Sequence, residues 1–378
     1  MFRRTFLKDL AFLASLAAPL SSSSVAAKNN LDADITAAHI PRWRGFNLQG
    51  RFSWPGHPYN GLAFDEFDFA TMAEWGFDFA RLPLSYWVWG SRDDWTVIRE
   101  EPLKQIDRAV DLGHQYGIHI NINFHRIPGY CINQRELEPA DLFTGTKPER
   151  DKALTAATFH WQAFAKRYKG IPNRQLSFDL INEPPKMHSY EGMLEERYVE
   201  IVNTLVAGIR EIDPHRLIFA DGMNIGQAPV EGIVNLQLVQ STRGYQPKAV
   251  SHYTATWVPK DEFEMFNPPT WPLTDDHAVV WNREHLQKVY VDLYKVITEK
   301  GVQVHVGEWG CYNKTPHDVT LAWMTDCLAV WKQAGWGNAM WNLRGAFGVM
   351  DSDRADVAYE DYKGHKLDRK MLELVRQA

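Results

Sequence analysis

The chain has 378 residues, of which 45% are hydrophobic and 23% are charged, and this composition excludes a fibrous or largely disordered protein. The formal net charge is −6, and no block of Lys and Arg stands out beyond the first eight residues, which argues against nucleic-acid binding. We therefore expect a globular protein with a neutral or weakly charged substrate and no nucleic-acid partner.

The first 27 residues resemble a targeting segment. A twin-arginine pattern begins at Arg3-Arg4, a short apolar run covers 10–20, and small residues form a cleavage-like site at 25–27. This pattern predicts a twin-arginine-type signal peptide over 1–27, with a basic amphipathic helix as the alternative. The apolar run is too short to span a bilayer.

The assignment of a signal peptide also sets the expected domain boundaries in the rest of the chain. We expect a flexible mature N-terminus over 28–40 and one catalytic domain over 41–378, since no linker divides that stretch. The mature protein is expected to be a periplasmic or extracellular monomer without membrane attachment. Its three cysteines, Cys131, Cys311 and Cys327, show no CxxC spacing and predict neither a zinc site nor a disulfide framework. A single disulfide among them stays open.

From about residue 41 short β-like runs alternate with amphipathic helical stretches, which predicts a parallel sheet with crossover helices. The helical period of 3.6 is clearest over 191–212 and 282–299. Eight strands can be counted, the number of a (β/α)8 barrel, an α/β fold. They are predicted at 43–48, 77–82, 118–124, 176–181, 217–220, 249–252, 302–306 and 338–343.

The segments that follow the third, fifth and sixth predicted strands are long and rich in Pro, Gly and aromatic residues. They cover 127–150, 221–248 and 253–281. Active sites of such barrels lie at the C-terminal ends of the strands, so long loops there predict a built-up cleft. Trp87, Trp257 and Trp271 fall in loops, where flat rings suit the faces of sugars.

Polar or ionisable side chains occupy the C-terminal ends of six of these strands, which is more than helix caps or loop anchors explain. They are Arg81, His125, Asn182 with Glu183, His252 with Tyr253, Glu308, and Trp341 with Asn342. A pair of glutamates across a barrel mouth best serves the cleavage of glycosidic bonds. One carboxyl protonates the leaving oxygen and the other attacks the anomeric carbon.

The motifs Leu180-Ile181-Asn182-Glu183-Pro184 and Val306-Gly307-Glu308-Trp309-Gly310, in this order and on strands four and seven, resemble glycoside hydrolase family 5. The similarity runs from Arg44-Gly45-Phe46-Asn47 to Gly345-Ala346-Phe347-Gly348. The resemblance implies a retaining glycosidase that cleaves a β-linked glycan without a cofactor.

The resemblance also implies roles for the residues at the strand ends. Glu183 would be the general acid/base and Glu308 the nucleophile, with Arg81 as a nearby positive charge. Asn182 would bind the sugar 2-hydroxyl. The remaining positions would bind the sugar or hold the carboxylates, namely His125, His252, Tyr253 and Trp341.

The sequence departs from the family pattern at one point. Many members place the tyrosine that contacts the nucleophile two residues after the histidine of strand six. Here Tyr253 follows His252 directly and Thr254 takes the next position. Either the strand end is offset or another hydroxyl serves.

Several alternatives remain open from the sequence. A metal-dependent hydrolase would need a His-x-His set after strand one, which Phe46-Asn47-Leu48-Gln49 does not offer, so no metal is expected. A catalytically silent carbohydrate-binding barrel and a transglycosylase are further possibilities. The preferred substrate is a β-1,4-glucan, as for an endoglucanase, with a β-mannanase or an exo-acting β-glucanase as the alternative.

Overall fold

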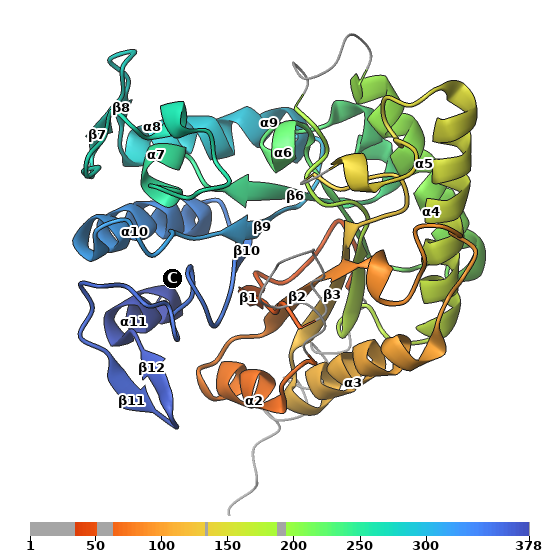
Figure 1. Cartoon of the computed structure of the whole chain (residues 1–378), viewed down its shortest axis with the longest axis horizontal. Helices are drawn as coiled ribbons and strands as arrows, with labels where there is room; N and C mark the ends of the chain where they lie inside the picture. The colour runs from red at the N-terminus through yellow and green to blue at the C-terminus, as the bar shows by residue number, and fades with distance from the viewer. Residues whose placement is uncertain (1–34, 51–62, 133–134, 187–193, 378) are drawn as a thin grey trace, which may run out of the picture. The chain divides into compact units, whose positions relative to one another are not determined.

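The computed structural model describes residues 35–50, 63–132, 135–186 and 194–377, and the predicted signal peptide lies outside them. A closed barrel of parallel strands, in the order β1-β10-β9-β6-β5-β4-β3-β2, forms the centre of the structure (Figure 1). This confirms the predicted (β/α)8 fold. The strands are β1 (Arg44–Asn47), β2 (Phe79–Ser85), β3 (His119–Arg126), β4 (Leu176–Asp179), β5 (Ile218–Asp221), β6 (Val239–Gly244), β9 (Val304–Trp309) and β10 (Gly337–Met340).

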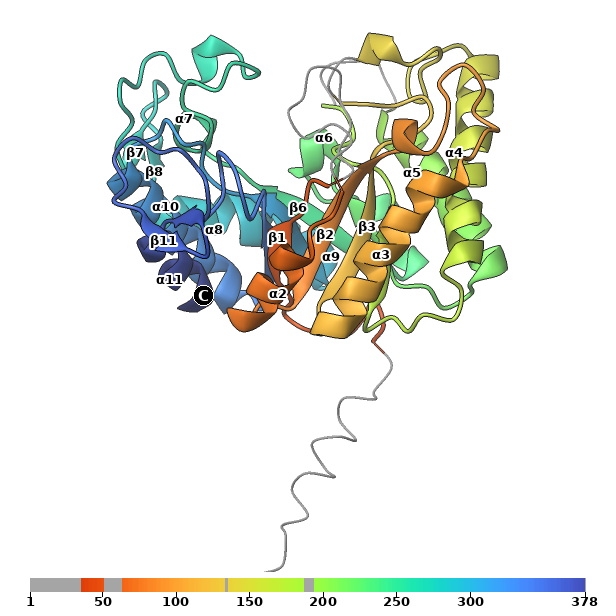
Figure 2. The ribbon, with the colours of Figure 1, turned by 60° about the horizontal axis from the view of Figure 1, so that its bottom comes forward.

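Helices surround the barrel, as the side view also shows (Figure 2). Both clearly periodic stretches are helical: α5 covers Leu194–Ile212, and α8 (Arg283–Gln287), a π-helical turn η6 (Lys288–Asp292) and α9 (Leu293–Thr298) follow one another directly. The other long helices are α2 (Glu66–Glu74), α3 (Glu100–Tyr116), α4 (Lys147–Arg167), α10 (His317–Gln333) and α11 (Arg369–Gln377).

The loops contain several shorter elements. α6 (Met223–Gly226) and α7 (Lys248–Ser251) lie near the ends of the strands in Figure 2. Single 3-10 turns are η1 (Tyr86–Val88), η2 (Arg135–Leu137), η4 (Glu231–Leu236) and η5 (Lys260–Glu262). Two small antiparallel hairpins complete the described chain, namely β7 (Leu273–Thr274) with β8 (Val280–Trp281) and β11 (Glu360–Tyr362) with β12 (His365–Leu367).

The sixth barrel strand is not where the sequence predicted it. Residues 249–252 lie mostly in α7, and the strand is β6, which pairs with β5 and β9. The reason is that four consecutive residues of β6, Gln240 to Arg243, are polar and all are buried, so the strand shows neither an apolar run nor alternation. Tertiary hydrogen bonds satisfy them: Gln240 bonds to Val230, and Thr242 bonds to Gly226.

Register places the ends of the strands at one rim. Asn47 of β1 pairs with Arg81 of β2, and Arg243 of β6 pairs with Glu308 of β9. Side chains far apart in the sequence therefore meet in one layer near the C-terminal rim of the barrel. This layer carries the polar groups that the sequence placed at strand ends.

Two apolar clusters stabilise the fold. The larger cluster fills the space between the barrel and the helices, where Phe124 of β3 stacks on Trp161 of α4 at 3.8 Å between ring centroids. The smaller cluster closes the N-terminal end of the barrel around Trp43 and Phe79. Ile35 and Ile40 pack against it, so the described part of the segment expected to be flexible, 35–40, contacts the barrel.

Trp161→Ala is expected to lower the free energy of unfolding by about 3–5 kcal/mol, because it removes a fully buried ring and leaves a cavity against Phe124. Denaturant unfolding measures the change. Phe159→Ala on the same helix is the matched control, since that ring is 40% exposed, and it is expected to cost far less. Equal losses in the two variants would contradict this account of the core.

Candidate active site

Two glutamates lie at the C-terminal ends of strands three places apart around the barrel. Glu308 lies within β9, and Glu183 follows β4. Glu183 has a positive φ of 49°, a conformation that costs a non-glycine residue about 1–3 kcal/mol. Its N–H donates to Asp221 Oδ2 at 2.8 Å, and its carbonyl accepts from the Tyr130 hydroxyl at 2.7 Å. These contacts hold the backbone that aims the Glu183 side chain.

Arg81 holds the second glutamate. Its guanidinium is buried and donates to Glu308 Oε1 at 2.6 Å, and through Nε to Asp179 Oδ2 at 2.8 Å. Nη1 also donates to Asn47 Oδ1 at 3.0 Å. Because Arg81 is always protonated, it supplies a fixed positive charge beside Glu308.

A second buried arginine, Arg243 of β6, contacts both glutamates. Its Nε lies 3.2 Å from Glu183 Oε1, and its Nη2 lies 3.3 Å from Glu308 Oε1. The same side chain forms a two-pronged ion pair with Asp221 of β5. One guanidinium therefore connects the two carboxylates.

Asn182 Oδ1 accepts hydrogen bonds from both arginines, at 2.9 Å from Arg81 Nη2 and 2.8 Å from Arg243 Nη2. This occupancy fixes the orientation of the amide, because only its oxygen can accept. The NH2 group is thus the part of Asn182 that is available to donate to a ligand. It lies 3.5 Å from His125 Nε2, and the His125 ring stacks on Trp341 with centroids 5.6 Å apart.

The electrostatic environments of the two glutamates differ. Burial and the nearby negative charge of Glu308 raise the pKa of Glu183 to about 8. Burial also raises the pKa of Asp179 to about 7, with the charge of Asp221 adding to the effect. Burial lowers the pKa of His252 to about 3, so this imidazole is neutral at physiological pH. Glu183 is therefore protonated at neutral pH, and it lies beside a Glu308 side chain that Arg81 contacts.

The tyrosine that contacts Glu308 is not the one that the sequence proposed. The Tyr245 hydroxyl lies 3.3 Å from Glu308 Oε2, whereas the Tyr253 hydroxyl donates to Asn267 Oδ1 at 2.6 Å on the exposed surface. His252 packs edge-on against Tyr245 instead of ending a strand. The offset arises because β6 ends at Gly244, eight residues before His252.

The three loop tryptophans lie in different surroundings. Trp257 is 50% exposed and packs against Tyr312 and Phe347. Trp271 donates its indole N–H to Asp326 of α10 at 2.9 Å, which ties this ring to a helix. Trp87 donates to Glu138 at 2.7 Å. Trp257 therefore presents the most open ring of the three.

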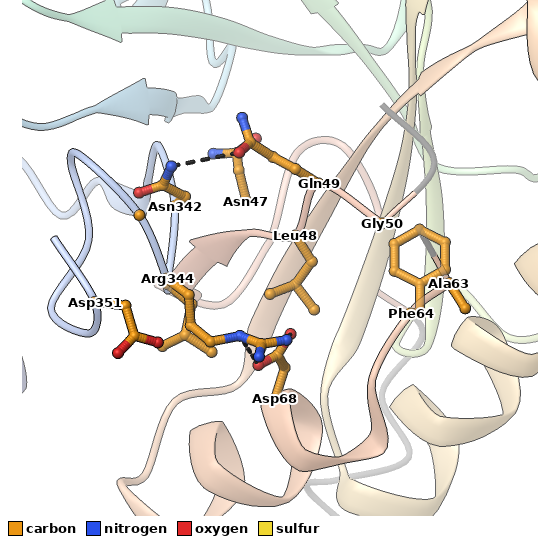
Figure 3. Close-up of a pocket in the computed structure, with 12 residues that line it drawn as sticks. Asn47, Leu48, Gln49, Gly50, Ala63, Phe64, Asp68, Asn342, Arg344 and Asp351 are labelled. Carbon is orange, nitrogen blue, oxygen red and sulfur yellow. Dashed lines mark hydrogen bonds and ion pairs between the residues drawn. The ribbon is translucent and has the colours of Figure 1, made fainter. Parts of the chain in front are cut away.

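A pocket of about 260 Å³ opens where the segments after β1 and β10 meet (Figure 3). Asn47 lines it and also contacts Arg81, which in turn contacts Glu308, so the pocket is connected to Glu308 through these two residues. Asn342 donates to Gln49 at 3.4 Å across it, and Arg344 pairs with Asp68 at its edge. Its polar lining offers several donors and acceptors to a hydroxyl-rich ligand.

The sequence missed Asn47, Asp179, Asp221, Arg243 and Tyr245 as members of this site. Asp179 carried a signal, since a charged residue inside an otherwise apolar strand needs a buried partner. Tyr245 also follows Arg243 by two residues, the spacing that the family pattern places between the strand-six histidine and the tyrosine, although Arg243 is not a histidine. That signal was hidden because β6 was not recognised as a strand. Among the described residues, no group of three or more His, Cys, Asp or Glu side chains has a geometry to hold a metal ion.

A closed parallel barrel with an elevated-pKa carboxyl and an arginine-bound carboxylate at its C-terminal rim has the architecture of a glycoside hydrolase. Comparison with known proteins agrees. The family model described as cellulase (glycosyl hydrolase family 5) matches residues 32–346. The chain therefore belongs to glycosyl hydrolase family 5 and is an O-glycosyl hydrolase.

Similar proteins cover most of the chain. Endoglucanase C of Acetivibrio thermocellus is 25% identical in an alignment of 343 positions that covers 84% of this chain and 95% of that protein. Cellodextrinase A of Ruminococcus flavefaciens is 24% identical over 77% of this chain and 82% of its own length. A crystal structure described as a glycoside hydrolase is 36% identical, with a TM-score of 0.82, and covers 89% of this chain and 99% of its own.

Tyr245→Phe is expected to lower kcat/KM roughly ten-fold, because it removes the hydroxyl beside Glu308 while the ring stays packed. Tyr253→Phe is the matched control and is expected to retain the activity of the wild type within about two-fold, since its hydroxyl bonds only to a loop side chain. Steady-state kinetics of both variants measure the difference. A larger loss in Tyr253→Phe would contradict the assignment.

Proposed function

We propose that the protein hydrolyses internal bonds of a β-1,4-glucan by double displacement, with Glu183 as acid/base and Glu308 as nucleophile. The observation that carries these roles is the contrast between the two carboxyls. Glu308 lies 2.6 Å from the fixed charge of Arg81, which favours a carboxylate, while burial and Glu308 raise the pKa of Glu183 to about 8 and keep it protonated.

In the first step a Glu308 oxygen attacks the anomeric carbon and forms a glycosyl ester. The bond from that carbon to the leaving oxygen breaks, and Glu183 transfers its proton to this oxygen. Glu183 is then a carboxylate. Because Glu308 loses its charge in the ester, the repulsion that kept Glu183 protonated disappears, and the group becomes a base.

In the second step Glu183 removes a proton from water, and the water oxygen attacks the anomeric carbon. The ester bond breaks and Glu308 returns to the carboxylate. The NH2 group of Asn182, held by the two arginines on its oxygen side, is positioned to donate to the sugar 2-hydroxyl. Trp341, stacked with His125, supplies an apolar face beneath the sugar next to the bond that is cut.

The substrate proposal has two supports. The similar proteins over most of the chain are named as an endoglucanase and a cellodextrinase. The polar pocket between β1 and β10 and the open ring of Trp257 offer hydrogen bonds and a stacking surface to a neutral chain of sugars. A β-mannanase and an exo-acting β-glucanase are the alternatives.

We also propose that residues 1–27 direct export and that 41–378 form the catalytic domain of a monomer in the periplasm or outside the cell. The twin-arginine pattern at Arg3-Arg4 and the small-residue site at 25–27 support this proposal. In the part of the chain that the structure describes, no helix combines the length and apolar character needed to cross a membrane. Cys131, Cys311 and Cys327 are buried free thiols.

A panel of β-glycans tests the substrate. The purified protein is expected to shorten carboxymethylcellulose faster than mannan, xyloglucan or β-1,3-glucan, and to lower its viscosity before short products accumulate. Proton NMR of the first products is expected to show the β-anomer. Preference for mannan, or a single short product from the start, would replace the substrate by one of the two alternatives, and an α-anomer would contradict double displacement.

Glu308→Gln is expected to reduce kcat by roughly 10⁴-fold or more, because the amide oxygen is too weak a nucleophile, while the side chain keeps its shape for binding. Initial rates and isothermal titration with an oligosaccharide measure both effects. Glu373→Gln is the control for the chemical change, since Glu373 is exposed on α11, the helix that follows the barrel strands. Turnover within ten-fold of the wild type in Glu308→Gln would exclude Glu308 as the nucleophile.

A further inference from the structure

Arg243 and Asp221 form a buried ion pair, and Arg243 contacts both glutamates. We propose that this pair is a positioning unit that directs the acidic proton of Glu183 to its Oε2 atom and holds the side chain in register with Glu308. The proposal rests on the proposed role of Glu183 as the acid. Neither side chain needs to touch the substrate for this role.

Asp221 holds Glu183 both at its backbone and, through Arg243, at its side chain. Its Oδ2 accepts the Glu183 N–H at 2.8 Å, which fixes a backbone in the left-handed region. The same carboxylate holds the guanidinium of Arg243, whose Nε lies 3.2 Å from Glu183 Oε1. The Tyr198 hydroxyl in turn donates to the Asp221 carbonyl at 2.6 Å. Backbone and side chain of the acid thus depend on one anchored carboxylate.

The contact with Arg243 decides which oxygen of Glu183 carries the proton. A guanidinium has donors only, so Glu183 Oε1 must accept its hydrogen bond. A protonated carboxyl accepts best through its carbonyl oxygen, which is then Oε1. The proton therefore resides on Oε2, the oxygen that Arg243 leaves available for the glycosidic oxygen.

The surrounding backbone is shaped to admit this guanidinium. A Cβ at Gly307 of β9 would lie 3.0 Å from Arg243 Nη1 and 2.4 Å from Ser241 Oγ. A Cβ at Gly226, whose φ is +70°, would lie 2.7 Å from Arg243 Cγ. Two glycines on different elements thus leave room for the Arg243 side chain. A larger residue at either position would displace the guanidinium from the two glutamates.

The charge of the pair also matters for the acid. Arg243 alone would favour the ionised form of Glu183, and Asp221 offsets it. Removal of the Asp221 charge leaves a cation 3.2 Å from Glu183 and lowers the pKa of the acid. The other titratable or charged groups around Glu183 are Glu308 of β9, Arg81 of β2, Tyr130 after β3 and Tyr245 after β6. Further out, Asp179 of β4 pairs with Arg81, His125 of β3 contacts Asn182, and the neutral His252 after α7 packs on Tyr245.

Asp221→Asn tests the unit through the pH profile of kcat/KM. The profile requires protonated Glu183, so the wild type is expected to lose activity above about pH 8. In the variant this alkaline limb is expected to move to lower pH by about one unit or more. Asp213→Asn is the matched control, because Asp213 pairs with the buried Arg216 at the N-terminal end of β5 and its loss affects stability alone. A limb that stays in place, or that moves equally in both variants, overturns the proposal.

Arg243→Lys tests the positioning unit independently, in case Asp221→Asn does not fold. Lysine keeps the charge but cannot contact both glutamates and Asp221 at once. We compare kcat/KM for aryl β-cellobiosides with phenol and with 2,4-dinitrophenol as leaving groups, since only the phenol needs a proton to depart. The loss for the phenyl glycoside is expected to exceed the loss for the dinitrophenyl glycoside at least about ten-fold. Equal losses overturn the role of Arg243 in directing the proton.

The wild-type protein separates this proposal from the proposed function. If it cleaves neither cellobioside, the proposed substrate is wrong, and the same comparison is made with aryl glycosides of the sugar that the glycan panel identifies. If Glu308→Gln keeps its turnover, the assigned roles of the glutamates are wrong. A wild-type pH profile in Asp213→Asn, together with an unmoved alkaline limb in Asp221→Asn, counts against the positioning unit alone.

Discussion

The site depends on the convergence of two buried guanidinium groups on a single oxygen, Asn182 Oδ1. Two positive charges at this depth are costly unless each has a partner, because removal of an ion from water costs several kcal/mol even after the protein relaxes. Asp179 and Asp221 provide those partners from β4 and β5. Each guanidinium thus has its own carboxyl partner in addition to its contact with a glutamate.

This arrangement explains why the two glutamates differ although they have the same side chain. Arg81 contacts Glu308 at 2.6 Å and is also paired with Asp179, whereas Arg243 lies 3.2 Å from Glu183 and 3.3 Å from Glu308 and is also paired with Asp221. Burial and the nearby charge of Glu308 raise the pKa of Glu183 and outweigh the opposing effect of the two arginines. The same contacts orient Asn182, so electrostatics and hydrogen-bond geometry come from one network. Arg243 contacts both carboxyls, so a change at this residue affects both.

Much of the fold follows from local patterns. Strands such as β3 and β4 have apolar residues that face the outer helices, and α5 shows a helical period, so their positions are evident in the sequence. The motifs around Glu183 and Glu308 lie at the ends of such strands. β6 differs because Gln240 to Arg243 are polar and find their partners only in the folded barrel. The error there displaced the expected tyrosine from Tyr245 to Tyr253.

The sequence by itself determined the α/β barrel, the family and the two glutamates, because these depend on periodicity and on short contiguous motifs. Only the tertiary structure decided which groups surround the glutamates. Arg243 lies 60 residues from Glu183 and 22 from Asp221 along the chain, and no local pattern connects them. Barrel closure brings them into contact, and the cost of burying unpaired charge then fixes which side chains must meet.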